Sequence, residues 1–171
     1  MGFDTTIGQT ILVKCALVGD AAVGKSAIAA ALSSDGAHFP KNYSMTTSLK
    51  LSRKTIKIED SDDEVCLILF DLAGQDVFET LIEPHFDQVG TFVVCFDLTN
   101  KQSFLNTEKW ANKMRALGVN VKGYLLGNKN DVNQDRQVIT DKEAQRLADK
   151  LNLKYFKVKL STLKTKLSIK L

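Results

Sequence analysis

The strongest constraint on this chain is a glycine-containing loop at residues 19–26, with the sequence GDAAVGKS. An apolar run at residues 11–18 comes before it and is typical of a buried strand. An alanine-rich stretch at residues 26–32 follows it and is typical of a helix. The glycines allow the backbone to curl so that successive N–H groups face one anion, and the positive end of the helix dipole points to the same place. This pattern predicts a phosphate-binding loop.

Within this loop we expect Lys25 to reach the outer phosphates of a nucleotide and the Ser26 hydroxyl to bind Mg²⁺. A plain glycine turn between a strand and a helix is the alternative, and the motif alone leaves it open. The residues expected to contact the nucleotide here are Gly19, Asp20, Ala21, Ala22, Val23, Gly24, Lys25, Ser26 and Ala27.

A second loop begins at Asp71, directly after an apolar strand predicted at residues 65–70. A carboxylate at a strand end can hold Mg²⁺ through water. Gly74 has no Cβ, so its N–H can approach a terminal phosphate, and Gln75 can orient a water molecule for in-line attack. Lys25 and Gln75 are therefore the candidate catalytic residues. A surface turn that begins with an aspartate is the alternative for this loop.

A third loop, with the sequence NKND at residues 128–131, follows a strand predicted at residues 121–126. We expect Asn128, Lys129 and Asp131 to contact the base. A buried carboxylate at Asp131 can accept hydrogen bonds from N1–H and the amino group of guanine, and adenine offers no such pair of donors. Alone, this is a polar loop of common residues. All three loops follow predicted strands, however, and in parallel sheets ligands bind outside the carboxyl ends of the strands.

The rest of the chain alternates strand and helix patterns. Strands are predicted at 11–18, 48–59, 65–70, 91–98, 121–126 and 153–160, helices at 26–32 and 104–117, and a further helix after a capping box of Thr140 and Glu143. The strands at 48–59 and 65–70 form an expected hairpin. Short, continuously apolar strands suit a parallel sheet covered on both faces. We therefore expect an α/β fold with a mostly parallel six-stranded sheet and helices on both faces.

Composition narrows the class of protein. The chain has 171 residues, 44% of them hydrophobic, which suits one domain with one core. A net charge of +3 without a dense basic patch does not predict nucleic-acid binding. Cys15, Cys66 and Cys95 lie in apolar runs and are expected to be core thiols in a reducing compartment. His38 and His85 are isolated, which argues against a metal site built from His and Cys.

With these three loops, the sequence resembles the Ras-like small GTPases over residues 10–160. The resemblance implies a three-layer P-loop fold that binds GTP or GDP with Mg²⁺ and hydrolyses GTP to GDP and phosphate. It also implies a first switch loop before the hairpin. There, Thr46 matches the threonine that senses Mg²⁺ and the γ-phosphate, Phe39 an aromatic packed on guanine, and Tyr43 a tyrosine that closes over the phosphates.

The long second strand and the pattern LTNKQSF…W resemble the Rab branch. The stretch SSDGAHFPKNYSMTTSLKL is similar to the Rab-like GTPases of the intraflagellar transport assembly (IFT-B). This resemblance implies a cytoplasmic protein of the cilium or flagellum that acts as a subunit of a trafficking complex, with a small β-sandwich protein as a partner. It leaves the activator and the exchange factor unidentified.

The sequence also departs from the family. Ala21 and Ala22 stand where relatives often have glycine or serine, and a methyl beside the γ-phosphate predicts slow intrinsic hydrolysis. The Ser-Ala pair that supports the base in relatives is absent near residues 159–160. Residues 161–171 form a basic tail without a long amphipathic stripe, so we expect the final helix of the fold to be missing. The expected division is an N-terminal extension at 1–10, a GTP-binding domain at 11–160 and this tail.

The sequence predicts a lipid anchor at neither of its ends. No cysteine lies near the C-terminus, so we expect no intrinsic prenyl group. Gly2 and Thr6 fit a loose myristoylation template, but the bulky Phe3 and acidic Asp4 argue against N-myristoylation.

Several functions fit these observations. The first is a switch that cycles between GTP and GDP. The second is an assembly subunit that holds GTP as a structural cofactor, and the third is a vesicle-trafficking Rab protein outside the cilium. An ATP-dependent kinase or motor is disfavoured, because Asp131 selects against adenine.

Overall fold

The computed structural model describes residues 8–37, 46, 49–72, 89–118, 122–159 and 168–169. Four residues expected at the site, Phe39, Tyr43, Gly74 and Gln75, lie outside these ranges. The elements are β1 (Thr10–Val18), α1 (Lys25–Ser33), β2 (Lys50–Ile58), β3 (Glu64–Asp71), β4 (Val89–Asp97), α3 (Lys101–Leu105), α4 (Thr107–Ala116), β5 (Gly123–Asn128), the 3₁₀ turn η2 (Gln134–Arg136), α5 (Asp141–Lys150), β6 (Leu153–Lys157) and β7 (Ser168–Ile169).

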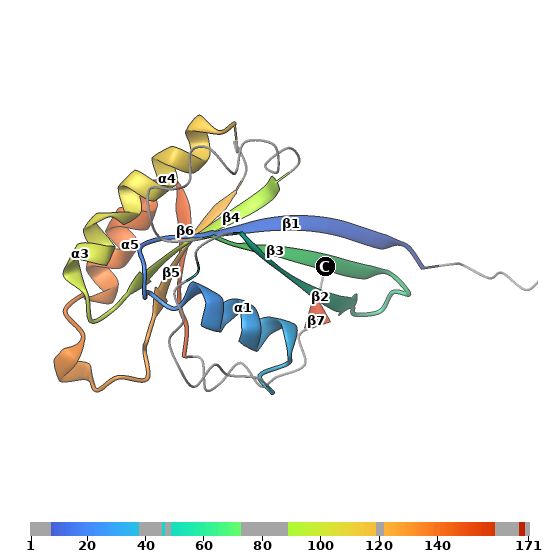
Figure 1. Cartoon of the computed structure of the whole chain (residues 1–171), viewed down its shortest axis with the longest axis horizontal. Helices are drawn as coiled ribbons and strands as arrows, with labels where there is room; N and C mark the ends of the chain where they lie inside the picture. The colour runs from blue at the N-terminus through green and yellow to red at the C-terminus, as the bar shows by residue number, and fades with distance from the viewer. Residues whose placement is uncertain are drawn as a thin grey trace, which may run out of the picture.

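The strands form one sheet in the order β6-β5-β4-β1-β3-β2-β7 (Figure 1). Every neighbouring pair is parallel except the β2–β3 hairpin. This confirms the predicted α/β fold with a mostly parallel sheet. The sequence predicts six strands, and the two-residue strand β7 adds a seventh along the edge of β2. Such a short pairing carries too little pattern to be recognised in a sequence.

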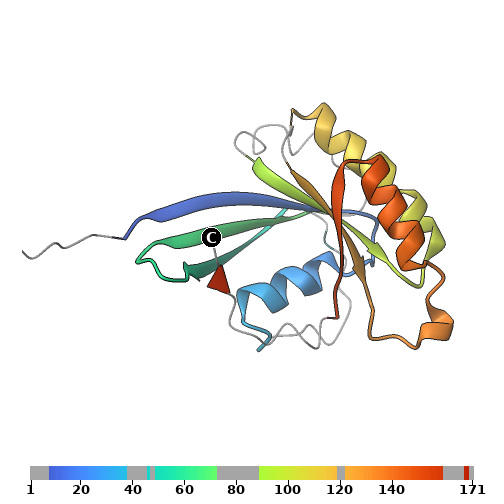
Figure 2. The same ribbon diagram turned by 180° about the vertical axis from the view of Figure 1, so that it is seen from behind.

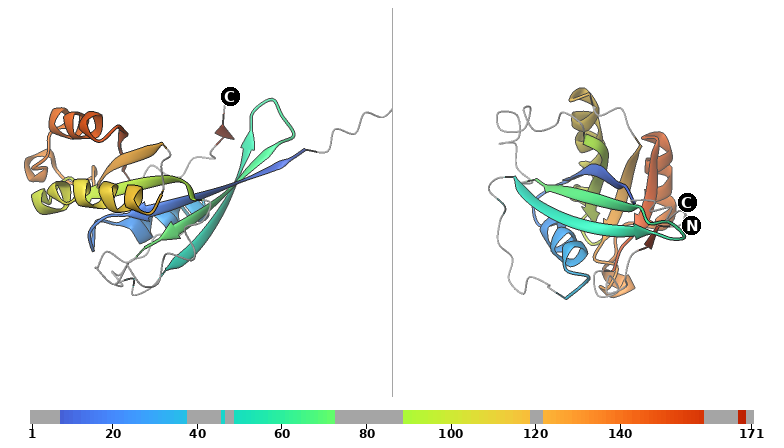
Figure 3. Two further views of the ribbon diagram at one scale, coloured as in Figure 1. Left: turned by 90° about the horizontal axis from the view of Figure 1, so that it is seen from above. Right: turned by 90° about the vertical axis from the view of Figure 1, so that its right-hand side faces the viewer.

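Helices cover the sheet on both faces. One face carries α3, α4 and α5, which pack around Phe92, Phe96, Trp110 and Met114 in the largest apolar cluster (Figure 2). The other face carries α1, whose Ala29 packs with Cys15, Leu17 and Leu69 of the central strands. The right-hand view of Figure 3 shows α1 and α4 on opposite sides of the sheet. Helices therefore cover both faces of the sheet, as the sequence predicts.

The predicted boundaries shift at several elements. The helix expected at residues 104–117 is two helices, which begin at Lys101 and at Thr107. Asn100 caps α3 by accepting hydrogen bonds from the N–H groups of Gln102 and Ser103. The apolar stripe on which the prediction rests begins later than this polar cap, so it places the start of the helix too late.

The capping box of α5 is confirmed. The Thr140 side chain accepts a hydrogen bond from the Glu143 N–H at 3.2 Å, and the Glu143 carboxylate accepts one from the Thr140 N–H at 2.9 Å.

Strand β5 lies two positions later than predicted, so that Asn128 is its last residue.

The three cysteines are buried and have free thiols, as predicted. Within the part of the chain that the structure covers, no helix is both long and apolar enough to cross a membrane. Of the basic tail at 161–171, the structure describes only β7, so the expectation that a final helix is missing stays a prediction.

Candidate nucleotide-binding site

The loop between β1 and α1 requires glycine at two positions. Gly19 and Gly24 adopt φ angles of 136° and 99°, in the region that side chains disfavour. A Cβ on Gly19 would lie 2.2 Å from the Cys95 carbonyl oxygen, and one on Gly24 would lie 2.2 Å from Asn128 Nδ2. Gly24 is also the N-cap of α1, so the amino end of this helix opens onto the loop. The loop therefore has the backbone that anion binding needs.

Lys25 is held inside the loop rather than in solvent. Its Nζ donates hydrogen bonds at 2.8 Å to the carbonyl oxygens of Gly19 and Asp20, and the residue is only 6% exposed. Burial lowers the pKa of Lys25, while the nearby carboxylates of Asp71 and Asp20 act in the opposite direction. Two of the three N–H donors of the ammonium group bond the loop itself. The positive charge of Lys25 is thus fixed at the amino end of α1, where phosphates would lie.

Two hydroxyls from different elements meet beside this loop. Ser26 Oγ at the start of α1 lies 2.9 Å from Thr46 Oγ1. An octahedral Mg²⁺ with ligands at about 2.0–2.1 Å places adjacent ligands about 2.9 Å apart. The spacing of the two hydroxyls therefore fits two neighbouring positions in the coordination shell of Mg²⁺.

Asp71, the last residue of β3, lies near the same point. It is fully buried, and neither carboxylate oxygen has a hydrogen-bond partner among the residues that the structure covers. Burial raises the pKa of Asp71, while the nearby Ser26 hydroxyl and the charge of Lys25 act to lower it. An unpartnered buried carboxylate is costly, and a divalent cation would satisfy it. The side chains present here thus fit a magnesium ion.

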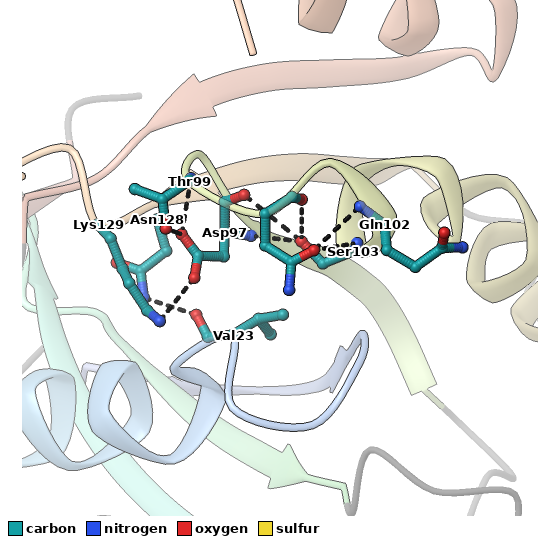
Figure 4. A network of polar contacts seen from close by, with 8 residues as sticks. Val23, Asp97, Thr99, Gln102, Ser103, Asn128 and Lys129 are labelled. Carbon is teal, nitrogen blue, oxygen red and sulfur yellow. Dashed lines mark hydrogen bonds and ion pairs between the residues drawn. The ribbon is translucent and has the colours of Figure 1, made fainter. Parts of the chain in front are cut away.

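The third loop is joined to the first by Asn128. Its Nδ2 donates to the Val23 carbonyl oxygen at 2.8 Å, and its Oδ1 is buried without a partner in the described part of the chain. The next residue, Lys129, has a φ of 63° and places its Nζ 2.6 Å from Asp97 Oδ2 (Figure 4). The carboxyl ends of β1 and β5 are therefore connected directly, as the parallel sheet predicts.

Asp97 is a residue that our sequence prediction missed. It ends β4, between β1 and β5, and its Oδ1 accepts hydrogen bonds from the Thr99 N–H at 2.8 Å and hydroxyl at 2.7 Å. Burial acts to raise the pKa of Asp97, but the hydrogen bonds from Lys129 and Thr99 outweigh it and hold the pKa below its ordinary value. A search for polar residues at the end of every predicted strand would have found it.

Asp131 differs from its prediction, because it is exposed and not buried. The loop that carries Asp131 lies outside the edge of the sheet, and main-chain hydrogen bonds hold it there. Asn130 N–H donates to the Val158 carbonyl oxygen at 3.4 Å, and Val158 N–H donates to the Gly127 carbonyl oxygen at 2.9 Å. The segment after β6 therefore supports this loop through main-chain bonds.

The structure thus brings three predicted groups of side chains to one edge of the sheet. They are the loop at 19–26 with its lysine, the Ser26, Thr46 and Asp71 oxygens, and the loop at 128–131. Asp20 is placed in the first loop, but its carboxylate turns toward α4, where it accepts hydrogen bonds from Asn106 and Trp110.

Comparison with known proteins agrees with this arrangement. A profile of the Ras family matches residues 14–167. An intraflagellar transport protein 27 homolog from Bos taurus is 40% identical over 137 residues, which are 79% of this chain and 73% of that protein. The homolog from Mus musculus is 37% identical over 148 residues, and that from Trypanosoma brucei brucei is 34% identical over 146 residues. Each of these two alignments covers 85% of this chain and 79% of the relative. The family match spans all three loops gathered at the sheet edge, and the chain therefore belongs to the Ras family of small GTPases.

Proposed function

We propose that this chain binds GTP and GDP together with Mg²⁺ at the loop formed by residues 19–26, and that it hydrolyses GTP slowly as a subunit of an intraflagellar transport assembly. Membership of the Ras family supports the nucleotide chemistry. The observation that carries the proposal for the site is the fully buried, unpartnered carboxylate of Asp71 close to the paired hydroxyls of Ser26 and Thr46.

Each side chain at the edge then has a role. Lys25 places its charge on the outer phosphates, and the α1 amino end adds N–H donors. Ser26 and Thr46 would bind Mg²⁺ directly and Asp71 would hold it through water, and the bound ion would neutralise charge on the phosphates. Asn128 and Lys129 shape the base pocket, and the exposed Asp131 carboxylate accepts the guanine donors.

Four more roles come from residues outside the described ranges. Gln75 would orient the attacking water and the Gly74 N–H would contact the γ-phosphate. Phe39 would pack on the base, and Tyr43 would close over the phosphates.

Slow hydrolysis follows from the alanines of the phosphate loop. Ala21 and Ala22 are both exposed at this loop, and Ala22 has a φ of 62°. Their methyl groups reduce the space that Gln75 and the attacking water need beside the γ-phosphate. The intrinsic rate of hydrolysis is measured by single-turnover conversion of GTP by the purified chain. Replacing Ala21 with Gly should speed the reaction, and a fast rate in the unaltered chain would contradict the proposal.

A ciliary role rests on the relatives, whose names are those of intraflagellar transport proteins. We propose that this chain likewise acts in the cytoplasm of the cilium or flagellum, within a complex that includes a small β-sandwich partner. A tagged chain expressed in ciliated cells tests this. Recovery of intraflagellar transport proteins with the tag is the expected result, and recovery of vesicle-trafficking proteins alone would favour a Rab function outside the cilium.

The contact between Thr46 and Ser26 supports the switch function, because Thr46, a residue of the expected first switch loop, lies beside the proposed magnesium ligand Ser26. A switch holds that loop only while the γ-phosphate is present. Partner affinity measured with GDP and with a non-hydrolysable GTP analogue distinguishes the two functions. Equal affinities would remove the switch and leave the structural cofactor.

A further inference from the structure

The phosphate loop contains an acidic residue that nucleotide binding does not explain. Asp20 follows Gly19, and its carbonyl oxygen accepts one of the two hydrogen bonds that hold Lys25. A free carboxylate so close to bound phosphates would repel them and compete for the lysine. The side chain of Asp20 therefore has to be directed away from the ligand.

Helix α4 supplies the groups that direct it. Trp110 Nε1 donates a hydrogen bond to Asp20 Oδ1, and Asn106 Nδ2 donates one to Asp20 Oδ2, each at 2.7 Å. Both carboxylate oxygens are thus engaged by neutral donors. Asn106 and Trp110 are four positions apart, so they lie on the same face of the helix.

The two donors are themselves held in place. Trp110 is 4% exposed and packs in the cluster that contains Met114 and Phe96. The amide of Asn106 is oriented by Gln102, whose Nε2 donates to Asn106 Oδ1 at 3.0 Å. Asp20 therefore contacts donors that are held by packing and by a hydrogen bond, and its carboxylate cannot move away without breaking its bonds to them.

We propose that Asn106 and Trp110 are positioning residues for the phosphate loop. They hold the Asp20 carboxylate against α4, which keeps the Asp20 carbonyl oxygen directed at Lys25 Nζ and keeps the negative charge away from the phosphates. This inference rests on the proposed nucleotide binding, and adds that α4 sets how tightly the loop retains its ligand.

Release of a fluorescent GDP analogue from the full chain in Mg²⁺ tests the inference. We expect Trp110→Phe and Asn106→Ala each to speed release about tenfold, because each removes a hydrogen bond to a charged group. Met114→Leu is the matched control, since it alters the buried face of the same helix and should leave release unchanged.

A double-mutant cycle separates positioning from simple packing. In a chain that carries Asp20→Ala, Trp110→Phe should change release by less than about twofold, because the group on which the indole acts is gone. An equal effect of Trp110→Phe in both backgrounds would overturn the inference. If Trp110→Phe does not fold, the same cycle with Asn106→Ala gives the answer, because that residue lies at the partly exposed junction of α3 and α4.

The wild-type chain separates the two proposals. If it takes up no guanine nucleotide, the proposed function fails and this inference fails with it. If the wild type binds nucleotide and both single variants release it at the wild-type rate, nucleotide binding stands and the positioning role alone is overturned.

Discussion

Two buried aspartates at the same sheet edge have opposite electrostatic environments. Asp71 has no hydrogen-bond partner within the covered ranges, and burial raises its pKa. Asp97 pairs with Lys129 and Thr99, which lower its pKa despite its burial. At the scale of single residues, the Asp71 carboxylate is left open to the proposed ligand, whereas the Asp97 carboxylate is satisfied within the protein. The two should therefore respond differently to pH and to neutralisation.

The sign of each effect follows from linkage. At pH values above its raised folded-state pKa, the ionised Asp71 lowers the stability of the metal-free fold. This loss of stability becomes smaller as the pH falls from the raised pKa toward the ordinary pKa of an aspartate. Asp97 stabilises the fold above the ordinary pKa, and this gain is lost as the pH falls through its lowered value. We expect Asp71→Asn to raise the free energy of unfolding in EDTA at pH 7 by about 1–3 kcal/mol. Asp97→Asn should lower it, and urea unfolding measures both. A decrease for Asp71→Asn would contradict the assignment.

Asp131 carries the prediction about base specificity. Replacing Asp131 with Asn exchanges an acceptor for a donor, and the amide can then pair with the carbonyl group that xanthine has in place of the amino group of guanine. We expect the variant to bind GDP at least about 100-fold more weakly and to gain affinity for xanthosine diphosphate. Titration with fluorescent analogues of both nucleotides measures this, and unchanged GDP affinity would place the base elsewhere.

Two helix ends contribute in different ways, one to the stability of its helix and the other to the geometry of the candidate site. Helix α5 has a complete capping box and packs in the same apolar cluster as α4. Helices α3 and α4 meet at Asn106, which contacts Asp20. The polar side chains at the start of α5 therefore stabilise their own helix, whereas Asn106 makes no side-chain cap on α4 and contacts the candidate site instead.

The capping box leads to a prediction that concerns helix α5 alone. We expect Thr140→Ala to lower the free energy of unfolding by about 1 kcal/mol, because α5 loses the hydrogen bond to the Glu143 N–H. Release of GDP should stay at the wild-type rate. Denaturant unfolding and nucleotide release, measured on the same preparation, test both parts, and faster release would show that α5 reaches the site.

For the whole molecule, the parallel order β5-β4-β1-β3 places the ends of four strands along one edge. A ligand at this edge would contact loops from both halves of the sheet, so its binding should stabilise the complete fold. Any ligand that binds only the folded chain raises its unfolding temperature through mass action.

This arrangement predicts a nucleotide-specific thermal shift. GDP with Mg²⁺ should raise the unfolding temperature by several degrees, and a concentration of about 100 times the dissociation constant corresponds to about 2.7 kcal/mol. EDTA should reduce the shift, because it removes the ion that we propose Ser26, Thr46 and Asp71 bind. ADP with Mg²⁺ is the control and should have little effect. An equal shift with ADP would contradict the guanine assignment.

Local patterns were sufficient to predict six of the seven described strands, the glycine loop with Lys25 and Ser26, and the capping box, because each depends on residues within a few positions of one another. Contacts across the sheet edge were not predictable in this way. The bonds from Asn106 and Trp110 to Asp20 join residues 86 and 90 positions apart, and the Lys129–Asp97 pair and the exposure of Asp131 depend equally on how layers pack. Packing selects such pairs by distance and orientation in space, and neither quantity leaves a periodic signal along the chain.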